Sequence, residues 1–176
     1  TITLTKAGDT NYNTATTSFT LSVGKIDQPS LVNAGATTAN FNEAPLTIAT
    51  TGGAGTGSVS ATDSSNASVA TVSGTQITII GAGTTTITLT KAGDTNYNPA
   101  TTSFTLSVAK IDQLALVNAG ATTASFGSAP LTIATTGGSG IGSATATVSS
   151  NASVATVSGA QITIIGAGTT TITLTK

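Results

Sequence analysis

The residues best suited to bind a ligand lie in one polar loop. Residues 94–98, Asp-Thr-Asn-Tyr-Asn, repeat the loop at residues 9–13. Carboxylate and amide oxygens are ligands that Ca²⁺ prefers, so this loop is the candidate metal site. Each copy holds one carboxylate, whereas tight calcium sites gather several. The pattern therefore favours a turn capped by its own side chains, with calcium as the alternative.

Lysine and aspartate recur as close neighbours in the chain. The pairs are Lys6 with Asp9, Lys25 with Asp27, Lys91 with Asp94, and Lys110 with Asp112. A covalent bond between a Lys and an Asn, an isopeptide, would need a buried carboxylate beside the pair. Glu43 becomes Ser128 and Asp63 becomes Val148 in the second copy, so neither carboxylate serves every copy. The sequence favours exposed ion pairs, which contribute ~0–1 kcal/mol each.

Glycine-rich and threonine-rich stretches suggest two further kinds of site. Residues 52–57 and 81–83 are rich in glycine, but neither opens a helix, so turns are favoured over phosphate binding. Thr84, Thr86, Thr88 and Thr90 are expected on one face of a strand at a spacing of ~6.7 Å. Such rows resemble ice-binding surfaces, but a twisting sheet favours an ordinary solvated face.

Two tripeptides match the acceptor pattern for N-glycosylation. They begin at Asn66 and Asn151. A match to so short a pattern usually arises by chance, so neither asparagine is assigned a sugar.

The composition excludes several classes of chemistry. The chain contains no His, Cys, Met or Trp. Charged residues make up 6% of it, and its net charge is −1. The usual ligands for zinc, copper and iron–sulfur centres are absent. Nucleophile–base pairs built on His or Cys are absent too. We therefore expect no enzyme, no cofactor and no catalytic or metal-binding residue.

The near-neutral charge also offers no footprint for nucleic acid or an anionic membrane. No apolar stretch approaches the ~20 residues that span a bilayer.

The chain repeats itself with a period of 85 residues. The run that starts at Thr1 returns at Thr86 and begins again at Thr171. This period suits one small domain rather than one turn of a solenoid. We predict residues 1–24 to be the C-terminal strands of a preceding repeat, 25–109 a complete repeat, and 110–176 the N-terminal part of the next.

The pattern within one repeat predicts about seven short strands. Residues 84–90 and 103–108 alternate polar and apolar side chains. Residues 45–50 share this period of two, and residues 68–72 with 76–80 predict a hairpin. No window has the spacing of a helix. The pattern predicts Ile87, Leu89, Phe104, Leu106 and Val108 to point inward and the threonines of 84–90 outward.

Turn signals separate these strands at intervals of about 8–12 residues. This spacing is typical of an antiparallel β-sandwich with Greek-key connections. The predicted fold class is all-β, with about seven strands in each sandwich.

Short connectors and open strand edges bear on assembly. Only residues 109–113 join two repeats, without a Gly/Ser or Pro run, which predicts a stiff rod. By themselves, residues 1–24 would expose the apolar Phe19, Leu21 and Val23. Open edges of this kind favour pairing with another chain. The chain is therefore either a window on a longer array or a unit that completes its neighbours head to tail.

One family shares these motifs. Residues 68–88, with Val-Ala-Thr-Val-Ser-Gly and Ile-Thr-Ile-Ile-Gly-Ala-Gly-Thr-Thr-Thr-Ile-Thr, precede Ala-Gly-Asp-Thr-Asn-Tyr-Asn-Pro-Ala at 92–100. This order closely resembles the bacterial immunoglobulin-like (Big-type) tandem repeats of large cell-surface and adhesin proteins. The resemblance covers nearly the whole chain and implies Ig-like sandwiches exported to the cell surface or beyond. The chain departs from antibody-type domains because it lacks the Cys pair and the core Trp.

The leading functional prediction is a structural repeat of an extracellular stalk or fibre without catalysis. Its expected partners are neighbouring repeats or copies of itself, joined head to tail or laterally. The alternative is an adhesin module that contacts a glycan, a partner protein or ice through its loops or its threonine-rich faces. Some repeat-specific aromatic or carboxylate cluster would favour that alternative, and only Glu43 and Asp63 come close.

Overall fold

The protein is built from β-strands and turns without any helix. The computed structural model describes residues 1–176 and divides into two compact units, Thr1–Ile111 and Asp112–Lys176. The predicted boundary between Ala109 and Lys110 lies two residues before the division at Ile111. No helix in the structure is long and apolar enough to cross a membrane.

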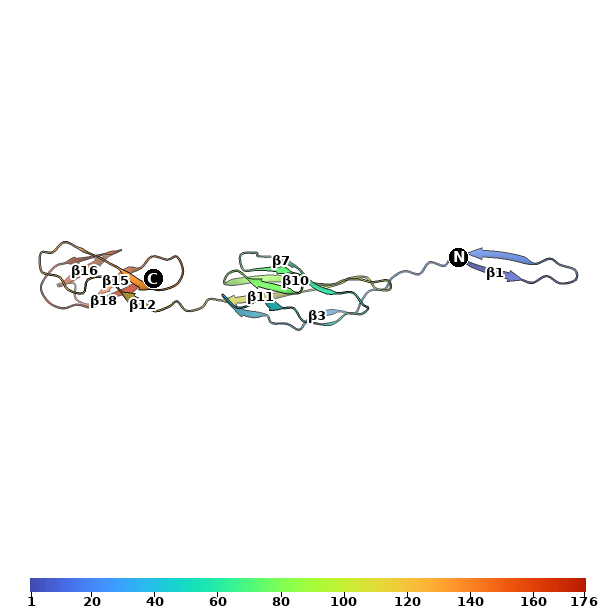
Figure 1. Cartoon of the computed structure of the whole chain (residues 1–176), viewed down its shortest axis with the longest axis horizontal. Coiled ribbons are helices and arrows are strands. Elements are labelled where there is room, and N and C mark those ends of the chain that lie inside the picture. The colour runs from blue at the N-terminus through green and yellow to red at the C-terminus, as the bar shows by residue number, and fades with distance from the viewer. The chain divides into compact units, whose positions relative to one another are not determined.

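The first unit contains a four-stranded sheet. Its strands are β4 (Thr38–Asn40), β11 (Ala100–Ala109), β10 (Gly83–Lys91) and β7 (Val59–Ser64), in that order across the sheet (Figure 1). The long strands β10 and β11, whose alternating patterns predicted them, form an antiparallel pair. The short strand β4 instead runs parallel to β11, so the expectation of purely antiparallel pairing is wrong at this edge.

The remaining strands of the first unit form two smaller sheets. One consists of β5 (Leu46–Thr47), β9 (Gln76–Ile79) and β8 (Ala70–Ser73), in that order. The other pairs β3 (Leu31–Asn33) with β6 (Thr50–Gly52). The hairpin expected around Gly74 is confirmed by the pairing of β8 with β9.

The single strand expected at residues 45–50 is divided in two. β5 pairs with β9, whereas β6 pairs with β3, so the chain changes sheets between them. This division and the short β3 and β4 raise the number of strands from β3 to β11 to nine, above the predicted seven or so.

The core of the first unit lies between its sheets. Ile77, Ile87, Leu89 and Leu106 are its largest fully buried side chains. Phe104 is partly buried against the same cluster. The inward orientation predicted from the alternating pattern is confirmed for β10 and β11, since Val108 is buried as well.

Thr85 corrects one part of that pattern. It was expected to point outward with the other threonines of β10, yet it is 3% exposed. Its hydroxyl lies 2.9 Å from Ser64 Oγ and accepts a 2.9 Å hydrogen bond from the backbone N–H of Asn66. Thr85 can be buried because the turn after β7 supplies partners for its hydroxyl.

The N-terminal residues form a separate hairpin. β1 (Ile2–Lys6) pairs antiparallel with β2 (Ala15–Phe19), and Ile2 lies opposite Phe19. Every residue from 1 to 24 is exposed. The hairpin repeats the sequence of β10 and β11 but has no sheet packed on its apolar face.

The second unit repeats most strands of the first. They are β12 (Leu116–Asn118), β13 (Leu131–Thr132), β14 (Thr135–Gly137), β15 (Thr145–Ser149), β16 (Ala155–Ser158), β17 (Gln161–Ile164) and β18 (Ile172–Thr175). β12 pairs with β14, β13 and β16 flank β17, and β15 pairs with β18. No strand of this unit corresponds to β4 or to β11.

Candidate functional site

The polar loop after β10 is held closed by its own aspartate. Oδ1 of Asp94 accepts hydrogen bonds from the backbone N–H groups of Asn96 at 2.8 Å and Tyr97 at 3.0 Å. Oδ2 accepts a further bond from the N–H of Thr56 at 2.7 Å. This geometry is the side-chain-capped turn that the sequence favoured. In the other copy, Asp9 caps its loop in the same way.

These hydrogen bonds also set the charge state of Asp94. The backbone N–H of Thr56, followed by that of Asn96, lowers the pKa of the Asp94 carboxyl below its ordinary value of 3.8. Hydrogen bonds to an ionised carboxylate favour the charged form. No group of three or more His, Cys, Asp or Glu side chains comes together to hold a metal ion.

Gln28 lies in the connector between the N-terminal hairpin and β3, and it links this connector to two loops of the first unit. The side-chain amide donates to the carbonyl oxygens of Asn98 at 2.8 Å and Ala92 at 3.1 Å. Its Oε1 accepts a 3.0 Å hydrogen bond from the N–H of Ala54. Nearby, the N–H of Ile26 donates to the carbonyl oxygen of Asn96 at 3.0 Å. The connector is thereby fastened to the domain that follows it.

The sequence analysis missed the role of Gln28. The available signal was its recurrence at the same place in the next connector, as Gln113. Gln113 makes a similar contact, because its Oε1 accepts a 3.1 Å hydrogen bond from the N–H of Ser139.

The predicted lysine–aspartate neighbours bond to other groups in the first unit. Lys91 Nζ donates to the carbonyl oxygen of Gly57 at 2.8 Å. Asp27 accepts a 2.8 Å hydrogen bond from the side-chain amide of Asn98. Lys91 therefore bonds to the loop between β6 and β7, and Asp27 bonds to the loop between β10 and β11. Gln28 contacts the same two loops.

The other candidate residues occupy surface turns and edges. Gly52, Gly53 and Gly55 have φ angles of 80°, 70° and 72°, so the glycine-rich run forms tight turns. A Cβ at Gly55 would clash with Asp94 Oδ2, which shows how closely the two loops approach. Asn66 is exposed, and its Oδ1 accepts a hydrogen bond from the N–H of Ser68.

The threonines of the expected outward row differ in exposure. Thr84 and Thr86 are exposed, whereas Thr88 and Thr90 are half-buried. Thr90 Oγ1 lies 3.1 Å from Thr62 Oγ1 on β7, and Thr62 also donates to the carbonyl oxygen of Thr88. Part of the row therefore bonds to the neighbouring strand.

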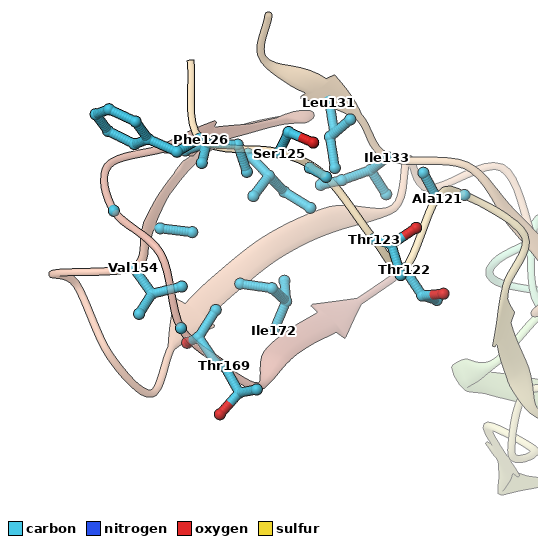
Figure 2. A pocket seen from close by; sticks show the side chains of 18 of the residues that line it. Ala121, Thr122, Thr123, Ser125, Phe126, Leu131, Ile133, Val154, Thr169 and Ile172 are labelled. Atoms are coloured by element: carbon cyan, nitrogen blue, oxygen red, sulfur yellow. The ribbon is translucent and has the colours of Figure 1, made fainter. Parts of the chain in front are cut away.

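A groove of about 650 Å³ lies in the second unit. Figure 2 shows Leu131, Ile133, Val154 and Ile172 around it, with Thr122 and Thr123 along one side. Ile162, Ile164 and Leu174 add to its apolar lining. The lining residues carry hydrocarbon and hydroxyl side chains together with Asn118, and none of them is ionisable.

The groove lies beside β18, at the position that β11 covers beside β10 in the first unit. Ile87 and Leu89 are completely buried in the first unit, whereas their counterparts Ile172 and Leu174 are half-buried. In the first unit, β11 lies against β10 and covers this position. The 176 residues include no counterpart of β11 after β18, which pairs with β15 alone.

Comparison of the chain with protein-family models, with curated proteins and with solved structures finds no match. The sites above therefore rest on the sequence and the geometry of this chain.

Proposed function

We propose that this chain is a structural segment of an extracellular, cell-surface stalk or fibre, built from tandem Ig-like β-sandwich repeats. Each 85-residue period supplies one domain, and the domains act as spacers without chemistry of their own. The likeness of residues 68–100 to bacterial surface repeats favours export and this role.

The connector carries the proposal. Gln28 bonds to Ala54, Ala92 and Asn98, and Ile26 bonds to Asn96, so the residues before the first sandwich are part of its surface. A connector fastened in this way cannot act as a free tether, because its backbone is ordered by the following domain. The same glutamine stands in the next connector, which extends the arrangement to successive repeats.

The length of the strands in the first unit also suits a spacer domain. Its two long strands, β10 and β11, run the length of one sheet, with a fastened loop at one end. These strands of 9 and 10 residues cover roughly 30 Å, and the loops at their ends bring the domain to roughly 30–40 Å. A stack of such domains would set a distance without taking part in a reaction.

Small-angle X-ray scattering of polypeptides with two, four and six consecutive periods tests this proposal. A stalk requires the maximum dimension to increase by roughly 30–40 Å with each added domain. A maximum dimension that levels off as periods are added would show repeats folding onto one another, and the spacer function would be wrong.

A further inference from the structure

The turns after β7 and β15 carry the two tripeptides that match the N-glycosylation pattern. One begins at Asn66, between β7 and β8, and the other begins at Asn151, between β15 and β16. The tripeptide alone assigns no sugar, because the pattern is an acceptor only on a surface loop. Residues 65–68 and 150–153 are all exposed, so both tripeptides have this setting.

The backbone of each asparagine is anchored by the fold. The N–H of Asn66 donates a 2.9 Å hydrogen bond to Oγ1 of the buried Thr85. The carbonyl oxygen of Asn66 accepts hydrogen bonds from the N–H groups three and four residues later, at 3.0 and 3.2 Å. In the second unit, the N–H of Asn151 donates to Thr170 Oγ1 at 3.0 Å. The turn therefore holds each asparagine at a fixed place on the surface.

The side chain of each asparagine bonds to the chain only through its oxygen. Oδ1 of Asn66 accepts a 3.1 Å hydrogen bond from the N–H of Ser68, and Oδ1 of Asn151 accepts one of the same length from Ser153. The amide nitrogen Nδ2 of either asparagine makes no hydrogen bond to the chain, and neither does the hydroxyl group of either serine. The two polar groups that define the acceptor pattern are thus exposed and without a partner in both units.

Closing the turn does not account for these unpartnered groups. Asp9 and Asp94 close their loops with a carboxylate oxygen that accepts the N–H two residues later, as Oδ1 of Asn66 does. Both Asn and Asp form turns of this kind. An aspartate at position 66 would therefore close this turn too, and what asparagine adds is the NH₂ group.

We propose that Asn66 and Asn151 are acceptor sites for N-linked sugars. The donor is a sugar activated by a phosphate group at C1. Nδ2 of the asparagine forms a bond to C1, and the bond between C1 and the phosphate oxygen breaks. The phosphate leaves with the electron pair, and Nδ2 gives up one proton to a base of the transferase.

The site in the first unit lies away from the loops that fasten the connector. Thr85, which anchors Asn66, and Lys91, which bonds to the loop at Gly57, lie roughly 20 Å apart along β10. A sugar can therefore be added without disturbing the contacts of Gln28. Only 6% of the residues are charged, so bulky, hydrated sugars would supply the solubility that charge gives other surfaces. The inference goes beyond the spacer function and does not depend on it.

Peptide mass spectrometry of the protein purified from its native source tests the proposal. We expect the peptides that contain Asn66 and Asn151 to be heavier by whole sugar residues, with fragment ions that place the sugar on the asparagine. Asn40 and Asn96 are internal controls, because both are exposed but neither has a Ser or Thr two positions later. Both should be unmodified.

Three substitutions, made in the protein produced by its native source, separate the acceptor from the turn. Asn66→Asp keeps an oxygen for the N–H of Ser68 but removes Nδ2. It should lose the sugar at this position and keep the Ser68 amide protected from hydrogen exchange. Ser68→Ala should also lose the sugar, whereas Ser68→Thr, which keeps a hydroxyl group, should retain it. In all three variants, Asn151 should stay modified as in the native chain.

Three results would overturn the proposal. The first is a native protein in which both asparagines are unmodified. The second is an Asn66→Asp chain whose peptide around position 66 carries as much sugar as the native one. The third is a Ser68→Ala chain that is modified like the native chain, because the tripeptide would then not be what the transferase recognises. None of these would contradict the spacer function, which depends on how successive repeats stack.

Discussion

Asp94 and Thr56 join two loops of the first unit. The carboxylate of Asp94 accepts a 2.7 Å hydrogen bond from the backbone N–H of Thr56, on the loop between β6 and β7. This bond makes the largest contribution to lowering the pKa of Asp94 below 3.8. The loop that connects β10 to β11 is thus fixed by a charged group, and its stability depends on pH.

Acid should weaken the first unit through Asp94. A carboxyl whose pKa is lower in the folded than in the unfolded state stabilises the fold above its unfolded pKa. That contribution is lost as the pH falls through the folded pKa. We therefore expect the free energy of unfolding to decrease below about pH 4. Amide hydrogen exchange of β10 and β11 across a pH series, corrected for intrinsic exchange rates, measures this decrease.

Asp94→Asn should reduce that pH dependence, because the amide has no proton to gain in this range. Asp63→Asn removes an exposed charge that the second unit replaces with Val148, and it serves as the control. An Asp94→Asn chain with the same acid dependence as the native chain would show that Asp94 is not its source.

Thr85→Val should destabilise the first unit. The substitution keeps the shape of the side chain but removes the acceptor for the N–H of Asn66 and the partner of Ser64 Oγ. Leaving buried polar groups without partners costs about 1–3 kcal/mol. Chemical denaturation followed by hydrogen exchange in β10 gives the change in the free energy of unfolding. Thr86→Val, at an exposed position, should stay within about 0.5 kcal/mol of the native chain.

Leu106→Ala and Leu21→Ala compare the same repeat position in two settings. Leu106 is fully buried, so its truncation leaves a cavity and should cost about 2–5 kcal/mol. Leu21 is 62% exposed, so in dilute solution its truncation should change the free energy of unfolding by less than about 0.5 kcal/mol. Denaturation of both variants at low concentration measures the difference. Equal costs would mean that residues 15–23 pack into a core within the monomer.

Gln28→Ala should loosen the connector. The N–H of Ala54 donates directly to Gln28 Oε1, so its hydrogen exchange should become roughly tenfold faster when that acceptor is removed. Gln76→Ala, on the exposed face of β9, is the matched control and should leave Ala54 unchanged. Unchanged exchange at Ala54 in the Gln28 variant would mean that the side chain does not hold the connector.

The sequence predicted the parts of the fold that local pattern determines. Ile87, Leu89, Leu106 and Val108 lie inward as their alternation indicated, and the glycine at position 74 marks the hairpin of β8 and β9. Side chains of β-strands alternate between faces, so a clear period of two is sufficient for such predictions.

Pairings between distant segments could not be predicted in this way. The period of two continues from Leu46 to Ile48, yet β5 and β6 join different sheets because their partners differ. The period of two places Thr85 on the face of Ile87 and Leu89, but the partners of its buried hydroxyl, Ser64 and Asn66, lie 21 and 19 residues away in the sequence.

The central claim is that the 85-residue period is the unit of an extended stalk or fibre. Electron microscopy of the native material tests it most directly. The proposal predicts thin fibres or rods with an axial repeat near one or two domain lengths, that is, multiples of roughly 30–40 Å. Compact particles without any axial repeat would contradict it.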